Sequence, residues 1–137
     1  MANRWRAAGA RAWDGARLVS GADRRLVVLD SVLRAHPYLA EAHRARALAW
    51  RDLALGGSAL AEPRLSRAEA SLRSALRLRP SWGEAWADRA WLRYLQRDAA
   101  GARADLARSQ ELDPTNVPLA RSRANLGALL DRSTPTP

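Results

Sequence analysis

The sequence contains no cysteine, no phenylalanine and no lysine. Without cysteine there can be no disulfide framework, no thiolate metal site and no cysteine nucleophile. β-Branched residues are few, whereas alanine, leucine and arginine dominate, and this composition favours helix over strand. No apolar run approaches the roughly 18 residues of a membrane span, and the N-terminal segment lacks the apolar core of a secretory signal. We therefore expect an all-α chain that is cytoplasmic by default, or periplasmic or membrane-associated if a leader or anchor has been removed.

Groups that could carry out catalysis are also scarce. The only histidines are His36 and His43, which are seven residues apart with Pro37 between them, whereas a metal-binding pair on one helix face is four apart. Gly56 and Gly57 lack the following lysine and hydroxyl residue of a phosphate-binding loop, and no G-x-S-x-G segment occurs. The sequence predicts no metal, no cofactor and no catalytic residue, so we expect a protein that is not an enzyme.

The charge is strongly positive and is carried by arginine alone. Twenty-three basic residues face 14 acidic ones, which gives a formal net charge of +9. The excess is +6 over residues 1–67 and +3 over residues 68–137, and no run of five or six basic residues marks a nucleic-acid-binding tail. An arginine bias from a GC-rich genome explains such a composition. The alternative is an anionic partner, which could be a nucleic acid, a lipid surface or an acidic protein.

An internal period of 34 residues organises the chain. The nine residues that end at Pro80 (LRSALRLRP) align with the nine that end at Pro114 (LARSQELDP). The segments that begin at Pro37 (PYLAEAH) and Pro80 (PSWGEAW) also align. Within a unit, apolar residues recur at three- and four-residue spacing on both sides of Asp98, a good N-cap, which predicts two helices joined by a turn. Such a period is typical of stacked helix pairs.

This pattern resembles the tetratricopeptide repeat (TPR), a family of 34-residue helix pairs. The family has an aromatic residue early in the first helix, small residues where the helices cross, and a proline after the second helix. Residues 83–116 carry the resemblance best. Trp86 is the early aromatic residue, Ala90 and Ala102 are the small crossing residues, and Pro114 is the terminator.

The remaining segments match with departures. Residues 40–82 have His43 where an aromatic residue is usual and an inserted loop at about 54–63. Residues 6–39 fit loosely, as a degenerate terminal repeat or a plain helical hairpin. The resemblance implies one domain, residues 1–130, built as a right-handed solenoid of about three hairpins. A capping helix at 117–130 closes it, and residues 131–137 form a disordered tail.

In this family the first helices of the pairs line a concave groove. The positions that face it here combine arginines with aromatic and aliphatic residues: Arg44, Leu48, Arg51, Ala87, Trp91, Tyr94, Leu95, Arg121 and Asn125. Aromatic residues and arginine carry much of the binding energy at interfaces, and arginine pairs well with carboxylates. We therefore expect a protein-interaction scaffold or adaptor that binds a peptide or protein segment of acidic character.

Three further expectations follow from the resemblance and the charge. Some family members hold a C-terminal carboxylate with a lysine and asparagine set, but Leu48 and Ala87 depart from that set, so this specificity is not carried over. The segment RPSWGEAWADRAW is similar to short bacterial proteins of envelope or exopolysaccharide biosynthesis. Self-association through Trp5 and Trp13 is a further expectation, and binding of nucleic acid or an anionic surface is the alternative function.

Overall fold

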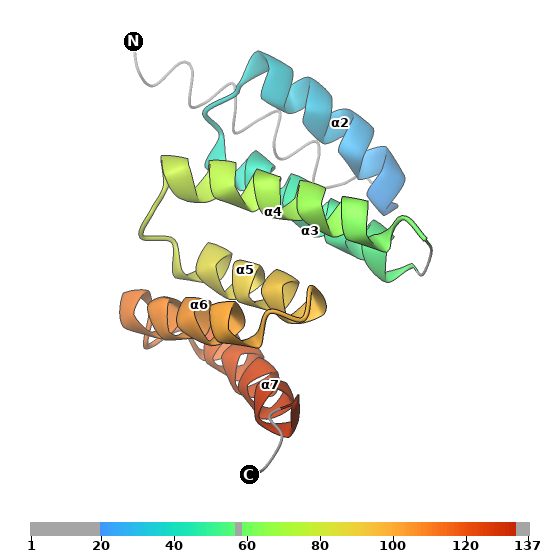
Figure 1. The fold of residues 1–137 in the computed structure, drawn as a ribbon. Helices are drawn as coiled ribbons and strands as arrows, with labels where there is room; N and C mark the ends of the chain where they lie inside the picture. Colours follow the sequence, from blue (N-terminus) through green and yellow to red (C-terminus); the bar gives the residue numbers. More distant parts are fainter. Residues whose placement is uncertain (1–19, 57–58, 134–137) are drawn as a thin grey trace. The chain divides into compact units, whose positions relative to one another are not determined.

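The computed structural model describes residues 20–56 and 59–133, and within these ranges it contains six α-helices and no strand. The helices are α2 (Ala22–Ala35), α3 (Ala40–Leu55), α4 (Ala61–Leu78), α5 (Gly83–Leu95), α6 (Ala99–Leu112) and α7 (Val117–Ser133) (Figure 1). The predicted all-α class is confirmed. The predictions for residues 6–19, for Trp5 and Trp13, and for residues 134–137 lie outside the described residues.

The chain divides into two compact units, residues 1–79 and residues 80–137. In the first unit, α3 packs against both α2 and α4. In the second unit, α5 and α6 pair with each other and α7 packs against both. Each unit therefore contains one helix pair of the predicted type and one further described helix that covers it.

The core of the first unit joins α2 to α3. Leu29, Val32 and Leu33 of α2 form a buried cluster with Ala42 of α3. At the contact of α3 and α4, small residues are buried on both helices, and Ala68 is fully inaccessible to solvent. A larger side chain at Ala68 would force the two helix axes apart, because protein cores are packed without spare volume.

The helix pair of the first unit is longer than that of the second, mainly because its helices are longer. α3 and α4 have 16 and 18 residues, whereas α5 and α6 have 13 and 14. The connection between α3 and α4 is residues 56–60, shorter than the expected loop at 54–63. Pro63 is the third residue of α4, where its missing N–H has no effect because the first-turn N–H groups lack intrahelical acceptors.

The second unit is built around Ala90, Ala102, Leu126 and Leu130. α6 begins at the predicted N-cap Asp98, whose carboxylate accepts a 2.9 Å hydrogen bond from the Gly101 backbone N–H. α7 continues to residue 133, three residues beyond its expected end at 130, because no helix-breaking residue occurs before position 135. None of the described helices is both long and apolar enough to cross a membrane.

Candidate functional site

Trp91, at the centre of the predicted binding surface, is held between α5 and α7. Its indole Nε1 donates a 3.1 Å hydrogen bond to the Ser122 hydroxyl on α7. The Tyr94 ring meets the Trp91 ring edge to face, with centroids 6.2 Å apart and an interplanar angle of 88°. Both rings pack on the core of the second unit and both stay partly exposed. The result is a fixed aromatic surface, since packing and a hydrogen bond hold the tryptophan in one orientation.

Two of the predicted binding residues lie on α7, close to Ser122 in the sequence. Arg121 and Asn125 are both exposed and are four residues apart, so they lie on one face of α7. Ser122, the partner of Trp91, lies between them in the sequence. The hydrogen bond between Trp91 and Ser122 thus joins α5 to the segment of α7 that carries Arg121 and Asn125. Ser122 was missed by sequence reasoning, because a single serine in a helix gives no signal of its partner.

The other predicted residues have different positions. Ala87 is only 2% exposed, so it offers almost no surface to a ligand, whereas Leu95 is partly exposed near the end of α5. Arg44, Leu48 and Arg51 belong to α3 in the first unit and are partly exposed. One guanidinium nitrogen of Arg51 lies 3.4 Å from the Asp52 carboxylate, which is a weak surface ion pair.

A buried carboxylate joins α5 to α6. Asp105 is 3% exposed and accepts two hydrogen bonds from Arg89, from Nε at 2.9 Å and from Nη2 at 3.2 Å. Arg93 Nε lies 3.2 Å from the same carboxylate. The Arg89 guanidinium also stacks over the Trp86 ring, 4.8 Å from its centroid. Two guanidinium groups thus compensate one buried carboxylate, and this arrangement positions α5 on α6.

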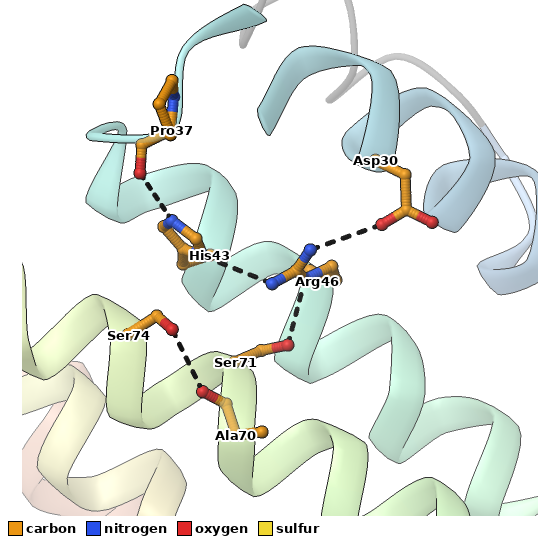
Figure 2. Close-up of polar contacts among 7 residues, drawn as sticks. All are labelled: Asp30, Pro37, His43, Arg46, Ala70, Ser71 and Ser74. Atoms are coloured by element: carbon orange, nitrogen blue, oxygen red, sulfur yellow. Dashed lines mark hydrogen bonds and ion pairs between the residues drawn. The ribbon is translucent and has the colours of Figure 1, made fainter. Parts of the chain in front are cut away.

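The first unit has a neutral version of this contact. Arg46, which aligns with Arg89, donates from Nε to the Ser71 hydroxyl at 3.1 Å, and Ser71 aligns with Asp105. Arg46 also reaches Asp30 of α2, at 3.4 Å, and so it links all three described helices of the unit (Figure 2). Arginine at this repeat position therefore serves as a connector in both units.

His43 takes the place of the early aromatic residue. Its Nε2 lies 2.8 Å from the Pro37 carbonyl oxygen, and Trp86 Nε1 donates to the Pro80 carbonyl in the same way at 2.9 Å. Arg46 Nη2 lies 3.5 Å from His43 Nδ1, as Figure 2 shows. Because arginine can only donate, Nδ1 accepts and Nε2 carries the proton, which defines a neutral imidazole. Burial, together with the charge of Arg46, lowers the pKa of His43 below 6.5, although the hydrogen bond to Pro37 opposes the shift.

Arg123 of α7 is a buried charge at the C-terminal end of α6. It is 7% exposed, and its Nη1 donates to the Ser109 carbonyl, the Ser109 hydroxyl and the Asp113 carbonyl at 3.0–3.3 Å. The negative end of the helix dipole favours a cation here. The capping helix α7 therefore does more than cover apolar surface, because Arg123 also donates hydrogen bonds to carbonyl groups at the end of α6.

A pocket of about 470 Å³ lies within the second unit, lined by Tyr94, Leu95, Arg97, Ala99 and Ser133. Tyr94 and Leu95 belong to the predicted binding residues, whereas Arg97 was not among them. In the part of the chain that the structure describes, no group of three or more His, Asp or Glu residues is arranged to hold a metal ion.

Comparison with known proteins identifies the fold. No protein-family model matches the sequence, and no curated protein matches it. Among solved structures, the chain is similar to the first TPR of Spaghetti (RPAP3) bound to the HSP90 peptide SRMEEVD, with a TM-score of 0.64 and 20% identity over 95% of this chain and 93% of that one. It is also similar to the first TPR domain of human RPAP3, with a TM-score of 0.63 and 21% identity over 98% of both chains. The chain therefore has the TPR-like fold of paired helices that its sequence predicts.

Proposed function

We propose that this chain is a protein-interaction module that binds an acidic peptide segment on the surface formed by Trp91, Tyr94, Arg121 and Asn125. The observation that carries this proposal is the anchoring of Trp91 to Ser122, which fixes a partly exposed aromatic ring against the helix that carries the exposed Arg121. The solved structure with a similar fold holds an acidic peptide, which supports the same class of ligand.

The chemistry of this surface suits an acidic segment. A fixed aromatic ring loses little conformational entropy when a ligand covers it, so more of the contact energy appears as affinity. Arg121 can pair with a carboxylate through two parallel hydrogen bonds, and the Asn125 amide can both donate to and accept from a peptide backbone. In the first unit, α3 offers two arginines and an aliphatic residue, and we propose these as further partner-binding residues: Arg44, Leu48 and Arg51.

Selection from a library of random peptides tests the proposal without knowledge of the partner. We expect the immobilised chain to enrich peptides rich in Asp and Glu. The Trp91→Ala and Arg121→Ala variants should lose this enrichment while keeping their helicity. Arg108→Ala is the matched control, because Arg108 is an exposed arginine of the same unit that pairs with Glu111. Enrichment of basic peptides, or equal enrichment by Trp91→Ala, would contradict the proposal.

The alternative function, binding of nucleic acid or an anionic surface, is favoured by one observation. Residues 1–79 contain 15 arginines and 7 acidic residues, whereas residues 80–137 contain 8 and 7. Electrostatic binding of this kind weakens steeply as salt concentration rises. Absence of any RNA or DNA shift at physiological salt would remove this alternative.

Two narrower proposals remain from the sequence. A role in bacterial envelope or exopolysaccharide biosynthesis rests on the segment RPSWGEAWADRAW, and the genes that neighbour the coding sequence test it. Self-association is tested by sedimentation, which should show a mass that rises with protein concentration.

A further inference from the structure

The pocket of the second unit lies where three helices meet. Tyr94 and Leu95 are the last two residues of α5. Ala99 is the first residue of α6, and Ser133 is the last residue of α7. Tyr94 and Ala99 pack directly on the buried core of the unit, so this wall of the pocket is fixed by the fold. Its volume of about 470 Å³ is in the range of natural sites for small ligands. The wall formed by Tyr94 and Ala99 is therefore part of the packed structure, and the exposed Arg97 side chain completes the lining.

Arg97 occupies a backbone position that favours glycine. Its φ angle is 65°, in the left-handed region, and it is the only non-glycine residue with positive φ among residues 20–56 and 59–133. Hydrogen bonds fix the turn, since the Arg97 N–H donates to the Tyr94 carbonyl at 3.0 Å and the Asp98 N–H to the Arg93 carbonyl at 2.8 Å. Residues held in this region without being glycine concentrate at functional sites. Arg97 thus has a backbone conformation that glycine would adopt without strain.

The groups around the pocket define the chemistry of a ligand. Within the described residues, neither the Arg97 guanidinium nor the Tyr94 hydroxyl has a hydrogen-bond partner or an ion pair. The Ser133 hydroxyl donates to the Leu129 carbonyl, so it is not available as a donor. Leu95, Ala99 and the ring of Tyr94 supply apolar wall. The pocket therefore offers one cation and one O–H donor above an apolar surface.

We propose that this pocket is a binding subsite for a carboxylate carried on an apolar stem, with Arg97 as the residue that selects it. The occupant is a glutamate side chain of the peptide segment that covers Trp91 and Tyr94, because Tyr94 belongs both to that surface and to the pocket. This part of the inference rests on the proposed function. The chemistry of the pocket itself does not, and a small carboxylate can test it alone.

Hexanoate is the direct probe, followed by nuclear magnetic resonance of the backbone amides. We expect saturable shifts confined to Tyr94, Leu95, Arg97, Ala99 and their neighbours. Acetate, which has the same charge without the stem, should bind at least about tenfold more weakly because it buries less apolar surface. Arg97→Ala and Arg97→Gly should each weaken hexanoate binding at least about tenfold, or ~1.4 kcal/mol.

The two Arg97 variants separate binding from folding. Arg97→Gly removes the backbone strain, so this variant should unfold at a higher urea concentration than the wild type while it loses hexanoate. Loss of binding in a more stable protein cannot come from unfolding. Arg108→Ala, the exposed control arginine of α6, should bind hexanoate as the wild type does.

Three results would overturn the subsite. These are the absence of saturable shifts with hexanoate, equal binding of acetate and hexanoate, or full hexanoate binding by Arg97→Gly.

Peptide selection separates this inference from the proposed function. If wild type and Arg97→Gly select the same acidic peptides, the subsite is wrong and the proposed function stands. If no peptide is enriched but hexanoate binds through Arg97, the pocket stands as a carboxylate site and the proposed function is wrong.

Discussion

Replacing Asp105 by asparagine tests the contact that we infer to hold α5 on α6. The Asp105 side chain is 4% exposed, whereas Arg89 and Arg93 are 21% and 24% exposed. Asparagine has nearly the same shape but only one acceptor oxygen, so two guanidinium groups lose their counter-charge. Removing one partner of a buried ion pair typically costs ~3–5 kcal/mol. Because water can reach part of both arginines, we expect a loss of about 2–3 kcal/mol of unfolding free energy.

Amide hydrogen exchange gives this prediction a local readout. A loss of about 2–3 kcal/mol corresponds to exchange of roughly 30- to 150-fold faster in α5 and α6, if exchange there follows unfolding of the unit. Amides of α3 and α4 should keep their wild-type rates. Ser71→Ala is the matched control at the aligned position of the first unit, where Arg46 loses a neutral acceptor and about 1 kcal/mol is expected. The reasoning would be refuted if the exchange rates in α5 and α6 stayed within about threefold of the wild-type rates, because this corresponds to a loss of less than ~1 kcal/mol of unfolding free energy.

Four further predictions concern backbone fit and pH. Arg97→Gly should raise the free energy of unfolding by about 1 kcal/mol in urea titrations, since glycine adopts positive φ without strain. His43, whose pKa is lowered from 6.5, stabilises the fold fully above pH 6.5, and this contribution should fall with pH until the lower folded pKa is reached. Unfolding of His43→Trp should lack this component, and an unchanged pH profile would contradict the assignment. Gly83→Ala should destabilise, because its Cβ would lie 2.8 Å from Asp113 Cβ. Gly127→Ala should be neutral or stabilising by up to ~1 kcal/mol, because nothing lies within 4 Å of its added Cβ.

The fold was predictable from the sequence because its signals are local or periodic. Ala90 and Ala102 were predicted at helix crossings, and both are fully buried. Asp98 was predicted as an N-cap from its position before a helical stripe, and its side chain caps α6. Spacing and capping act within a few residues, and the 34-residue period appears when the chain is compared with itself, so a single sequence is enough to detect all three.

The contacts of the candidate site could not be predicted in the same way. Ser122 is 31 residues from Trp91, and Asp105 is 16 residues from Arg89. Neither pair belongs to a motif, and only the packing of one helix on another brings its members together. Arg97 was also missed, because its significance comes from a φ angle and a pocket that the residue type alone does not reveal.

Some of the arginines have a structural role, which the net charge alone does not reveal. Arg46, Arg89 and Arg123 occupy one repeat position, immediately before a small residue, and each hydrogen-bonds to a neighbouring helix. Arginine suits this position because its stem covers apolar surface while its guanidinium reaches several acceptors in fixed directions. A coding bias supplies arginines but does not place them at one structural position. These three are engaged within the fold, so the acidic peptide that we propose as partner would be recognised by exposed arginines such as Arg97 and Arg121. That distinction is why the peptide and hexanoate experiments vary exposed arginines and leave the internal ones unchanged.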